Sequence, residues 1–168
     1  MHHQLTVFRT DLGWIGLLGA ESRVERLLMG HAAADEVRER LARDFNAGWS
    51  ESNWWPELKQ RLIDYTRGAV DDFRDVSVES SVTTPFGRRV IAALRRVRYG
   101  ETVSYGELAS RAGTPGAARA VGSVMRRNTV PLIVPCHRVI AAGGKLGGFS
   151  APQGVSLKQR LLDLEAAH

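Results

Sequence analysis

The sequence predicts an α+β fold, in which an N-terminal antiparallel sheet with helices packed on it is followed by a mainly helical C-terminal half. Short segments of alternating apolar residues at the start of the chain are typical of strands, and segments with helical spacing follow them. Two helix-start signals separated by a glycine then indicate a helix-turn-helix unit. We expect two domains, residues 1–80 as a support and residues 81–168 as the functional part.

Length and composition are those of an ordinary globular protein. The 168 residues are 43% hydrophobic and 24% charged, which is enough to bury a core. No apolar run approaches the roughly 18 residues of a membrane span, and the first residues lack a signal-peptide pattern. The one cysteine, Cys136, excludes an intramolecular disulfide and a cysteine-cluster metal site. We therefore expect a cytoplasmic protein without a membrane partner.

Charge is distributed unevenly along the chain. Residues 81–168 hold 13 Lys and Arg against 4 Asp and Glu, whereas residues 1–80 hold 10 against 14. A basic half joined to an acidic half indicates a polyanionic partner, nucleic acid before membrane. A solvated basic face would give the same counts, so charge alone supports DNA only weakly.

The first half is predicted to hold strands and two helices, because alternating segments precede segments of helical spacing. The expected elements are strands at residues 5–10, 14–19, 23–29 and within 70–80, helices at 33–45 and 55–68, and an exposed connection at 48–53. This half shows no catalytic constellation. Its histidines, His2, His3 and His31, lack the paired spacing and carboxylate partner of a metal site, so we expect no metal.

Helix-start signals organise the second half. Proline at the first helical position marks Thr84-Pro85, and Ser104 with Glu107 forms a capping box. Gly113 breaks the capped helix, and Thr114-Pro115 supplies the N-cap and first position of the next one. The three helices are expected at residues 84–99, 104–112 and 114–127. The last two form the helix-turn-helix unit.

The second helix of that unit presents two faces. Its apolar stripe consists of Ala117, Val121 and Val124. On another face, small residues separate two arginines at i, i+3, i+4 and i+7, namely Arg119, Gly122, Ser123 and Arg126. Such a face would let a DNA backbone approach closely, although a solvated face is the simpler alternative for one arginine alone.

The cysteine segment is followed by a glycine-rich loop and a last helix. Residues 142–150 contain four glycines, which indicates a backbone that approaches something closely. The segment Ser156-Leu157-Lys158-Gln159 is interpreted as a second capping box that opens a helix with a leucine stripe. Glu165 lies on the flank of that stripe. It is either a salt-bridging edge residue or the orienting partner of a histidine, and its position alone favours the edge residue.

The only thiol lies in Val134-Pro135-Cys136-His137-Arg138-Val139-Ile140. A lone cysteine in an apolar run is usually a packing residue, because free cysteine behaves as a small hydrophobe. That interpretation does not explain why proline, histidine and arginine adjoin it. A functional thiol is therefore the better hypothesis.

These motifs resemble the O6-alkylguanine-DNA alkyltransferase family, also called methylated-DNA–protein-cysteine methyltransferases. The resemblance is dense from about Pro85 to Glu165 and thinner around Gly13-Trp14-Ile15-Gly16. The residues that carry it are Ser104-Tyr105-Gly106-Glu107-Leu108-Ala109, Ala117-Ala118-Arg119-Ala120-Val121-Gly122, Asn128, Pro135-Cys136-His137-Arg138-Val139 and Leu161-Leu162-Asp163-Leu164-Glu165.

The resemblance implies direct-reversal DNA repair. Cys136 would take the alkyl group from O6 of guanine in double-stranded DNA and keep it, so that each chain acts once and needs no cofactor. It also implies an RNase H-like N-terminal domain, a winged-helix-like C-terminal domain, and a monomer that can cluster along DNA.

Roles of the site residues also follow from the resemblance. His137 would act on the thiol through a water and Glu165 would fix the imidazole, which suits an extended Cys-His pair whose side chains point apart. Tyr105 would donate to guanine N3 and meet the flanking phosphate, and Asn128 would organise the site. Arg138 has no assigned role in transfer and is interpreted as structural.

The same resemblance implies how the base is held. The backbone carbonyls of Cys136 and Val139 would accept from the guanine amino group, and Ser150 would donate near O6. Phe149 stands where the family often has tyrosine, so stacking is kept and a hydroxyl contact is lost. The base must first be flipped out of the duplex.

The recognition helix would perform that flipping from the minor groove. Arg119 would enter the base stack, while Gly122 and Ser123 permit close approach and Arg126 lies on the same face. Some members of the family bind zinc through cysteines in the N-terminal domain, and this chain has no cysteine there.

Two other classes of protein fit parts of the sequence. A non-catalytic DNA-binding module explains the charge and the helices but leaves the Cys-His-Arg segment and Glu165 unexplained. A cysteine hydrolase normally takes its base from a distant histidine. The chain offers no suitable second histidine, since His168 is terminal.

Overall fold

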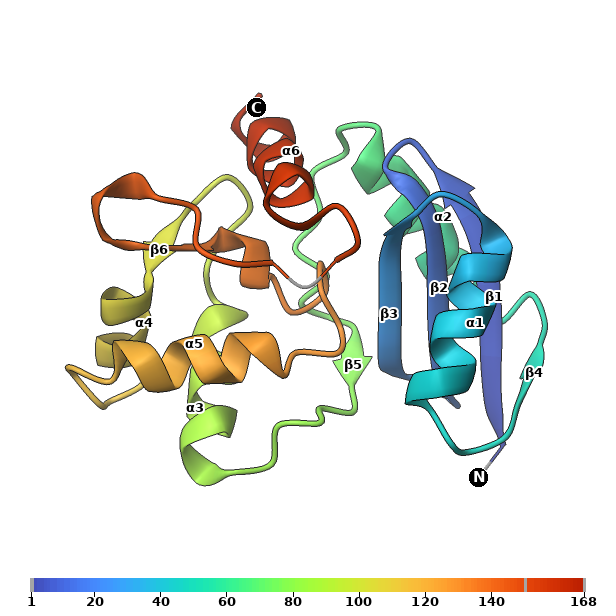
Figure 1. Ribbon diagram of the computed structural model, residues 1–168, viewed down its shortest axis with the longest axis horizontal. Coiled ribbons are helices and arrows are strands. Elements are labelled where there is room, and N and C mark those ends of the chain that lie inside the picture. Colours follow the sequence, from blue (N-terminus) through green and yellow to red (C-terminus); the bar gives the residue numbers. More distant parts are fainter. Residues whose placement is uncertain (1, 150, 168) are drawn as a thin grey trace.

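The computed structural model describes residues 2–149 and 151–167, with a sheet at one end of the molecule and a helical half at the other (Figure 1). The first part of the chain builds the sheet and the second part builds the helical half. The predicted α+β class is therefore confirmed.

Five strands form one sheet in the order β4-β1-β2-β3-β5. Their bounds are β1 His3–Thr10, β2 Gly13–Ala20, β3 Arg23–His31, β4 Trp49–Glu51 and β5 Ser77–Val78. Strands β1, β2 and β3 form an antiparallel meander, with Leu5 opposite Leu18 and Gly16 opposite Leu28. The two short edge strands pair in parallel, β4 with β1 and β5 with β3.

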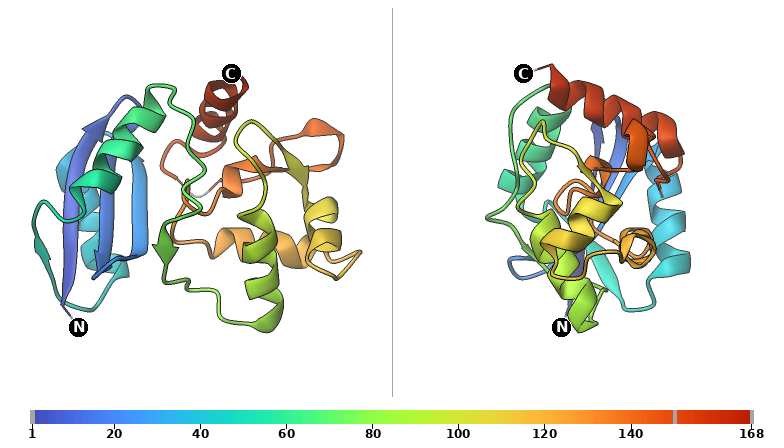
Figure 2. Two further views of the ribbon diagram at one scale, coloured as in Figure 1. Left: turned by 180° about the vertical axis from the view of Figure 1, so that it is seen from behind. Right: turned by 90° about the vertical axis from the view of Figure 1, so that its left-hand side faces the viewer.

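Two helices cover opposite faces of this sheet, α1 (Ala34–Asp44) and α2 (Pro56–Thr66) (Figures 1 and 2). Because side chains alternate along a strand, neighbours on β2 serve different faces. Leu18 packs in a small core with Leu41 of α1, whereas Leu17 belongs to the main core with Leu62 of α2. That main core continues without a break into the helical half.

The helical half is built around a helix-turn-helix unit (Figure 2). Its elements are α3 Pro85–Leu94, β6 Val103–Ser104, α4 Tyr105–Arg111, α5 Ala118–Arg126, the 3-10 turn η1 Cys136–Arg138, β7 Val139–Ile140, the turn η2 Ala142–Gly144 and α6 Gly154–Ala166. The predicted cap at Ser104 is confirmed, since Ser104 Oγ accepts from the Glu107 amide at 3.0 Å. Thr84 caps α3 in the same way, and its Oγ1 accepts from the Gly87 amide at 3.1 Å.

The predicted start of the second helix is wrong. Helix α5 begins at Ala118, and Thr114 does not cap it. Gly116 has φ +84°, a left-handed conformation that ends any helix begun at Pro115. The Thr114-Pro115-Gly116 segment is therefore part of the turn, and the turn is longer than predicted.

Other predicted boundaries also need correction. Helix α3 ends at Leu94 instead of Tyr99, and the supposed connection at residues 48–53 contains strand β4. Helix α6 begins at Gly154, so Ser156 lies inside it and donates its hydroxyl to the Gln153 carbonyl at 2.9 Å instead of capping. The cysteine and its histidine neighbour lie in a 3-10 turn and not in an extended segment.

Strand β3 joins the sheet to the helical half through its backbone. The Leu27 amide donates to the Thr129 carbonyl at 2.9 Å, and Thr129 Oγ1 donates to the Glu25 carbonyl at 3.2 Å. Gly30 has φ +76°, and a Cβ there would lie 2.8 Å from Leu157 of α6. Only glycine lets the strand approach α6 this closely.

Within residues 2–149 and 151–167, none of the helices combines the length and apolar character needed to cross a membrane.

Candidate active site

The cysteine is held at the end of a buried apolar run. Leu132, Ile133 and Val134 are all at most 2% exposed, and Cys136 follows at 9%. The Cys136 amide donates to the Val134 carbonyl at 2.8 Å, which fixes the turn that presents the thiol. Burial raises the pKa of the Cys136 thiol above its ordinary value, although a hydrogen bond from Asn128 and the charge of Lys158 oppose that rise. The resting thiol is therefore protonated at neutral pH.

His137 is fully buried and faces Glu165. Its Nε2 lies 2.7 Å from Glu165 Oε2, and both side chains are about 1% exposed. Burial lowers the pKa of His137, while Glu165 acts in the opposite direction. Burial also raises the pKa of Glu165, but hydrogen bonds from His137 and Arg138 outweigh burial and hold that pKa well below its usual range.

Arg138 completes the environment of this carboxylate. Its Nε donates to Glu165 Oε1 at 2.8 Å and its Nη2 to Oε2 at 3.1 Å, while Nη1 donates to the Val97 carbonyl at 2.8 Å. Asp72 Oδ1 also accepts from Nη1, at 3.2 Å. Because Arg138 is only 1% exposed, these contacts balance a buried positive charge. These contacts agree with the interpretation of Arg138 as a structural residue, and they tie it directly to Glu165.

Two further donors fix the other edges of Glu165. The Tyr65 hydroxyl donates to Oε2 at 2.5 Å, and the Gly100 amide donates to Oε1 at 3.2 Å. Burial raises the pKa of Tyr65 well above its ordinary value, so it stays a hydroxyl donor. Glu165 is therefore buried, and both of its carboxylate oxygens accept hydrogen bonds. The interpretation favoured by its position alone, a residue at the edge of the apolar stripe, is wrong.

The second ring nitrogen of His137 is left without a partner. Among the described residues, no group hydrogen-bonds to the buried Nδ1. A buried polar nitrogen normally has a protein or water partner. With Nε2 bonded to Glu165, Nδ1 is the atom of the ring that remains able to accept a proton.

A cavity of about 350 Å³ opens onto the thiol beside α5, the second helix of the helix-turn-helix unit, which we call the recognition helix. Several of the predicted site residues line it together, and the lining comprises Tyr105, Gly122, Met125, Arg126, Cys136, Gly148 and Phe149. Gly147 has φ +71°, and a Cβ there would lie 2.6 Å from the Tyr105 hydroxyl. A bare backbone at Gly147 is therefore needed for the loop to pass Tyr105.

The remaining predicted residues take different places. Asn128 Nδ2 donates to the Val134 carbonyl at 3.1 Å, and its Oδ1 accepts from the Val130 amide at 3.0 Å, so it ties the segment before the cysteine. Arg119 is exposed and Ser123 half-buried on α5, and neither lines the cavity. Ser150 lies outside the described residues.

Lys158 is a site residue that sequence reasoning missed. It is completely buried, and its Nζ donates to the carbonyls of Val139 at 2.6 Å, Gly148 at 3.4 Å and Leu146. The Val139 carbonyl, expected to face a base, therefore already has one donor. The sequence did contain a signal that Lys158 is buried. Lys158, Leu161 and Glu165 stand at i, i+3 and i+7, so they share one face of α6, and that face is buried.

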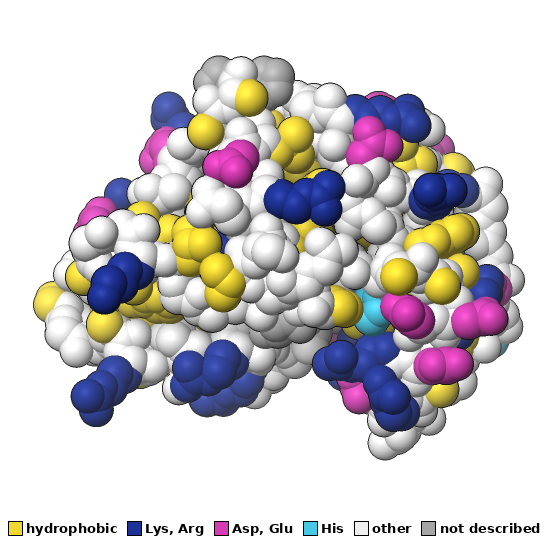
Figure 3. Space-filling model, turned by 45° about the horizontal axis from the view of Figure 1, so that its top comes forward, with side chains coloured by type: hydrophobic (Ala, Val, Ile, Leu, Met, Phe, Trp, Pro, Cys, Tyr) yellow, Lys and Arg dark blue, Asp and Glu magenta, His cyan; other side chains and the backbone are white. Residues whose placement is uncertain are grey.

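The surface beside the site is basic. Lys and Arg side chains extend along the lower edge of both halves of the molecule in Figure 3. Arg119 and Arg126 are exposed on α5. Such an edge suits the phosphates of a nucleic acid. Among the described residues, no group of three or more His, Cys, Asp and Glu side chains is placed to hold a metal ion.

Fold and site together define a helix-turn-helix protein with a buried cysteine beside a histidine–glutamate–arginine cluster. The profile of the family described as "6-O-methylguanine DNA methyltransferase, DNA binding domain" matches residues 85–167. A methylated-DNA–protein-cysteine methyltransferase of Mycolicibacterium paratuberculosis is 39% identical over 162 residues, which cover 96% of this chain and 93% of that protein. The chain therefore belongs to the O6-methylguanine-DNA methyltransferase family.

Other relatives and solved structures agree with this assignment. The constitutive methylated-DNA–protein-cysteine methyltransferase of Bacillus subtilis is 34% identical over 160 residues, covering 95% of this chain and 93% of that one. Mycobacterium tuberculosis OGT in complex with DNA superimposes with a TM-score of 0.81 at 35% identity, over 99% of this chain and 94% of the other. The O6-methylguanine-DNA methyltransferase of Pyrococcus kodakaraensis superimposes with a TM-score of 0.66 at 27% identity, over 97% of this chain and 98% of the other.

Proposed function

We propose that this chain repairs DNA by moving an alkyl group, typically methyl, from O6 of guanine to Sγ of its own Cys136. The observation that carries the proposal is the buried Cys136 beside His137, whose Nε2 is bonded to Glu165 and whose Nδ1 has no partner among the described residues. Relatives of similar length are methylated-DNA–protein-cysteine methyltransferases, and one similar structure is a complex with DNA. The transfer is irreversible, so each chain acts once.

The proton of the thiol passes through a water to Nδ1 of His137. Because burial raises the pKa of Cys136, the thiolate forms only when the imidazole takes this proton. Glu165 and its donors hold the ring in place and stabilise the imidazolium. A water fits this position since the orphaned Nδ1 needs a partner.

In the transfer step the Sγ–carbon bond forms as the carbon–O6 bond breaks. The electron pair of that bond stays on guanine, which then takes up a proton. The Tyr105 hydroxyl, which lines the same cavity as the thiol, stabilises this charge by donating to N3. Burial raises the pKa of Tyr105, so it remains a donor.

The base reaches the thiol by leaving the duplex. Helix α5 lies in the minor groove, Gly122 and Ser123 allow close approach, and Arg126 borders the cavity. Arg119 fills the gap in the stack after flipping. Phe149 stacks on the base, Ser150 donates near O6, Asn128 keeps the segment in place, and the carbonyls of Cys136 and Val139 accept from the amino group.

We further propose two domains, an RNase H-like support over residues 1–80 and a winged-helix-like part over 81–168 that binds DNA and accepts the alkyl group. The protein acts as a monomer that can cluster along DNA, in the cytoplasm. It needs no cofactor or metal.

Intact-mass analysis after mixing with an O6-methylguanine duplex tests the proposal. We expect the mass of one methyl group to be added per chain, on Cys136. A Cys136→Ser variant should gain no mass and still bind the duplex. An unmodified wild-type chain after complete binding would overturn the proposal.

A further inference from the structure

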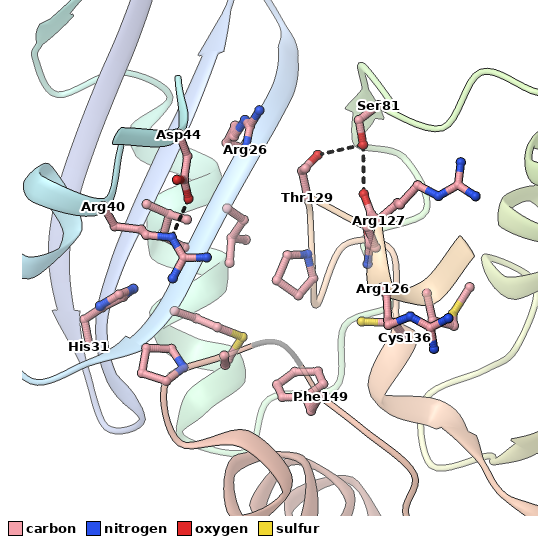
Figure 4. A pocket seen from close by; sticks show the side chains of 18 residues that line it. Arg26, His31, Arg40, Asp44, Ser81, Arg126, Arg127, Thr129, Cys136 and Phe149 are labelled. Carbon is pink, nitrogen blue, oxygen red and sulfur yellow. Dashed lines mark hydrogen bonds and ion pairs between the residues drawn. The ribbon is translucent and has the colours of Figure 1, made fainter. Parts of the chain in front are cut away.

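A second cavity reaches the thiol from the side of the sheet. It lies between β3 and α1 on one side and the cysteine segment on the other, and its volume is about 350 Å³ (Figure 4). We call it the β3 groove. It shares Met125, Arg126, Cys136 and Phe149 with the cavity beside the recognition helix but is otherwise lined by different residues. The groove that reaches the acceptor sulfur is therefore far larger than the roughly 30 Å³ that one water molecule takes up in the liquid, and it has room for more than a methyl group.

Apolar side chains form part of the lining of the β3 groove. They are Met29, Pro131, Phe149, Ala151 and Pro152. These side chains offer hydrocarbon contacts and no charge, so they suit an alkyl chain and disfavour a charged sugar-phosphate backbone.

The lining of the groove is also cationic. It includes four arginines, Arg26, Arg40, Arg126 and Arg127, and one carboxylate, Asp44. Asp44 is paired with Arg40, and no ion pair of Arg26 or Arg127 occurs among the described residues. Figure 4 shows Arg26 and Arg40 on the sheet side and Arg126 and Arg127 on the other side. The arginines therefore leave an uncompensated positive charge that spans the groove.

His31 adds no charge to this wall at neutral pH. It is 6% exposed, and burial lowers its pKa despite Glu36, whose carboxylate lies 3.7 Å away. The groove thus combines an apolar lining with positive charge, and Arg26 and Arg40 lie on the wall across from Cys136 (Figure 4). A ligand that spans the groove from the sulfur therefore begins with methylene groups and ends in an anion.

We propose that the β3 groove binds the far end of a long O6 substituent that terminates in a carboxylate. This inference rests on the proposed function and adds a substrate class to it, the ω-carboxyalkyl groups. Sγ forms its bond to the first carbon as the bond to O6 breaks, guanine keeps the electron pair and takes up a proton, and the carboxylate is unchanged.

The experiment compares three duplexes that carry O6-methylguanine, O6-(4-carboxybutyl)guanine or the neutral O6-(4-carbamoylbutyl)guanine. Second-order rate constants are measured by intact mass of the alkylated chain. We expect the acid to react about fivefold faster than the amide at low salt, since partly exposed arginines give modest gains. High salt should abolish the difference because it screens the arginines.

A double variant, Arg26→Gln with Arg127→Gln, should bring the ratio of acid to amide close to one. Arg43→Gln is the matched control, because Arg43 is exposed on α1 and does not line the groove. The ratio within one variant cancels any change in DNA affinity.

The possible failures are distinct. Absence of methyl transfer would overturn the proposed function itself. Normal methyl transfer with equal rates for acid and amide would overturn only the groove proposal, as would a ratio that the double variant leaves unchanged. A third outcome would also overturn the groove proposal. If the wild-type ratio of acid to amide were one and the double variant bound undamaged DNA more weakly, the groove would be a contact for a DNA strand.

Discussion

Glu165 holds the candidate site together through its contacts, and it also has a part in the proposed relay. It accepts hydrogen bonds from His137, from Nε and Nη2 of Arg138, from Tyr65 and from the Gly100 amide. Removing a buried charge that has this many partners leaves other groups unpaired, and Arg138 above all. Its packing role and its proposed role in the relay can nevertheless be separated by an isosteric change.

Glu165→Gln should lower the rate of methyl transfer by about a hundredfold, because a neutral amide cannot stabilise the imidazolium of His137. Single-turnover kinetics with an O6-methylguanine duplex measure this. The variant should also shift the pH profile of Cys136 alkylation by iodoacetamide, which a purely structural residue would not do. Asp163→Asn, an exposed change on the same helix, is the control. Unchanged rate and profile would exclude Glu165 from the relay.

Lys158→Met should slow transfer by about tenfold and leave DNA affinity nearly unchanged. The substitution keeps the length of the side chain but removes the donors to the Val139, Leu146 and Gly148 carbonyls, which hold the loop next to the base cavity. Rates by intact mass and affinities by fluorescence anisotropy separate the two effects. Lys145→Met, in the exposed part of the same loop, should match the wild type. An equal loss of rate and affinity would contradict a role in positioning the loop.

At this scale the sequence singled out residues that the fold brings together at the cysteine, and it did not predict which charged side chains are buried around them. Cys136, His137 and Glu165 stand in motifs that resemble a known family. Arg138 and Lys158 are charged, and charged side chains are expected on the surface unless a partner is known. Their partners are Glu165 and three backbone carbonyls, which only the folded chain brings near.

Among the elements, α5 carries the face that we propose to contact DNA. Its buried stripe includes Val121 and Val124, and its opposite side carries exposed Arg119 and Arg126. Sequence periodicity predicted both faces correctly. The start of the helix was predicted two to four residues too early, because Pro at a first helical position is a common signal and the left-handed Gly116 cannot be recognised from its neighbours.

Arg119→Ala should slow repair of O6-methylguanine in duplex DNA by about tenfold and have little effect on repair in single-stranded DNA. The reason is that the arginine is needed only to replace a base in a stacked duplex. Intact-mass time courses on both substrates give the comparison. Arg111→Ala, an exposed change at the end of α4, controls for lost charge. Equal slowing on both substrates would assign Arg119 to phosphate binding instead.

Short elements were the least predictable part of the fold. Strands β4 and β5 have three and two residues, and their existence depends on pairing with β1 and β3 instead of on local pattern. The 3-10 turn at Cys136 likewise depends on tertiary contacts and not on the local sequence pattern. Its apolar neighbours favour an extended chain locally, but packing of His137 and Arg138 against Glu165 requires both side chains to point inward.

For the whole molecule, buried titratable groups predict a loss of stability in acid. The pKa of His137 lies below its ordinary value of 6.5, so the unfolded chain gains a proton below that pH and the native protein does not. The pKa of Glu165 lies below its ordinary value of 4.5, so its contribution is full above that pH and is lost as pH falls through the native value.

The free energy of unfolding should therefore decrease as pH falls from 6.5 toward 4, by up to about 1.4 kcal/mol per pH unit for each proton taken up. Urea denaturation at several pH values measures this slope. His137→Asn should flatten the slope between pH 6.5 and 4.5, and the exposed His2→Asn should not. A steep slope that survives His137→Asn would assign the effect to other groups.

The contacts of the glutamate also determine when the thiol can become reactive during biosynthesis. Tyr65 and Glu165 are 100 positions apart, and Arg138 is 66 from Asp72 and 41 from Val97. Contacts between such distant residues form slowly and after local ones. A nascent chain in which only the helix-turn-helix has folded would thus lack the contacts that hold His137 and Glu165 beside the cysteine. Transfer through the proposed relay is therefore expected only after the last tertiary contacts of the fold have formed.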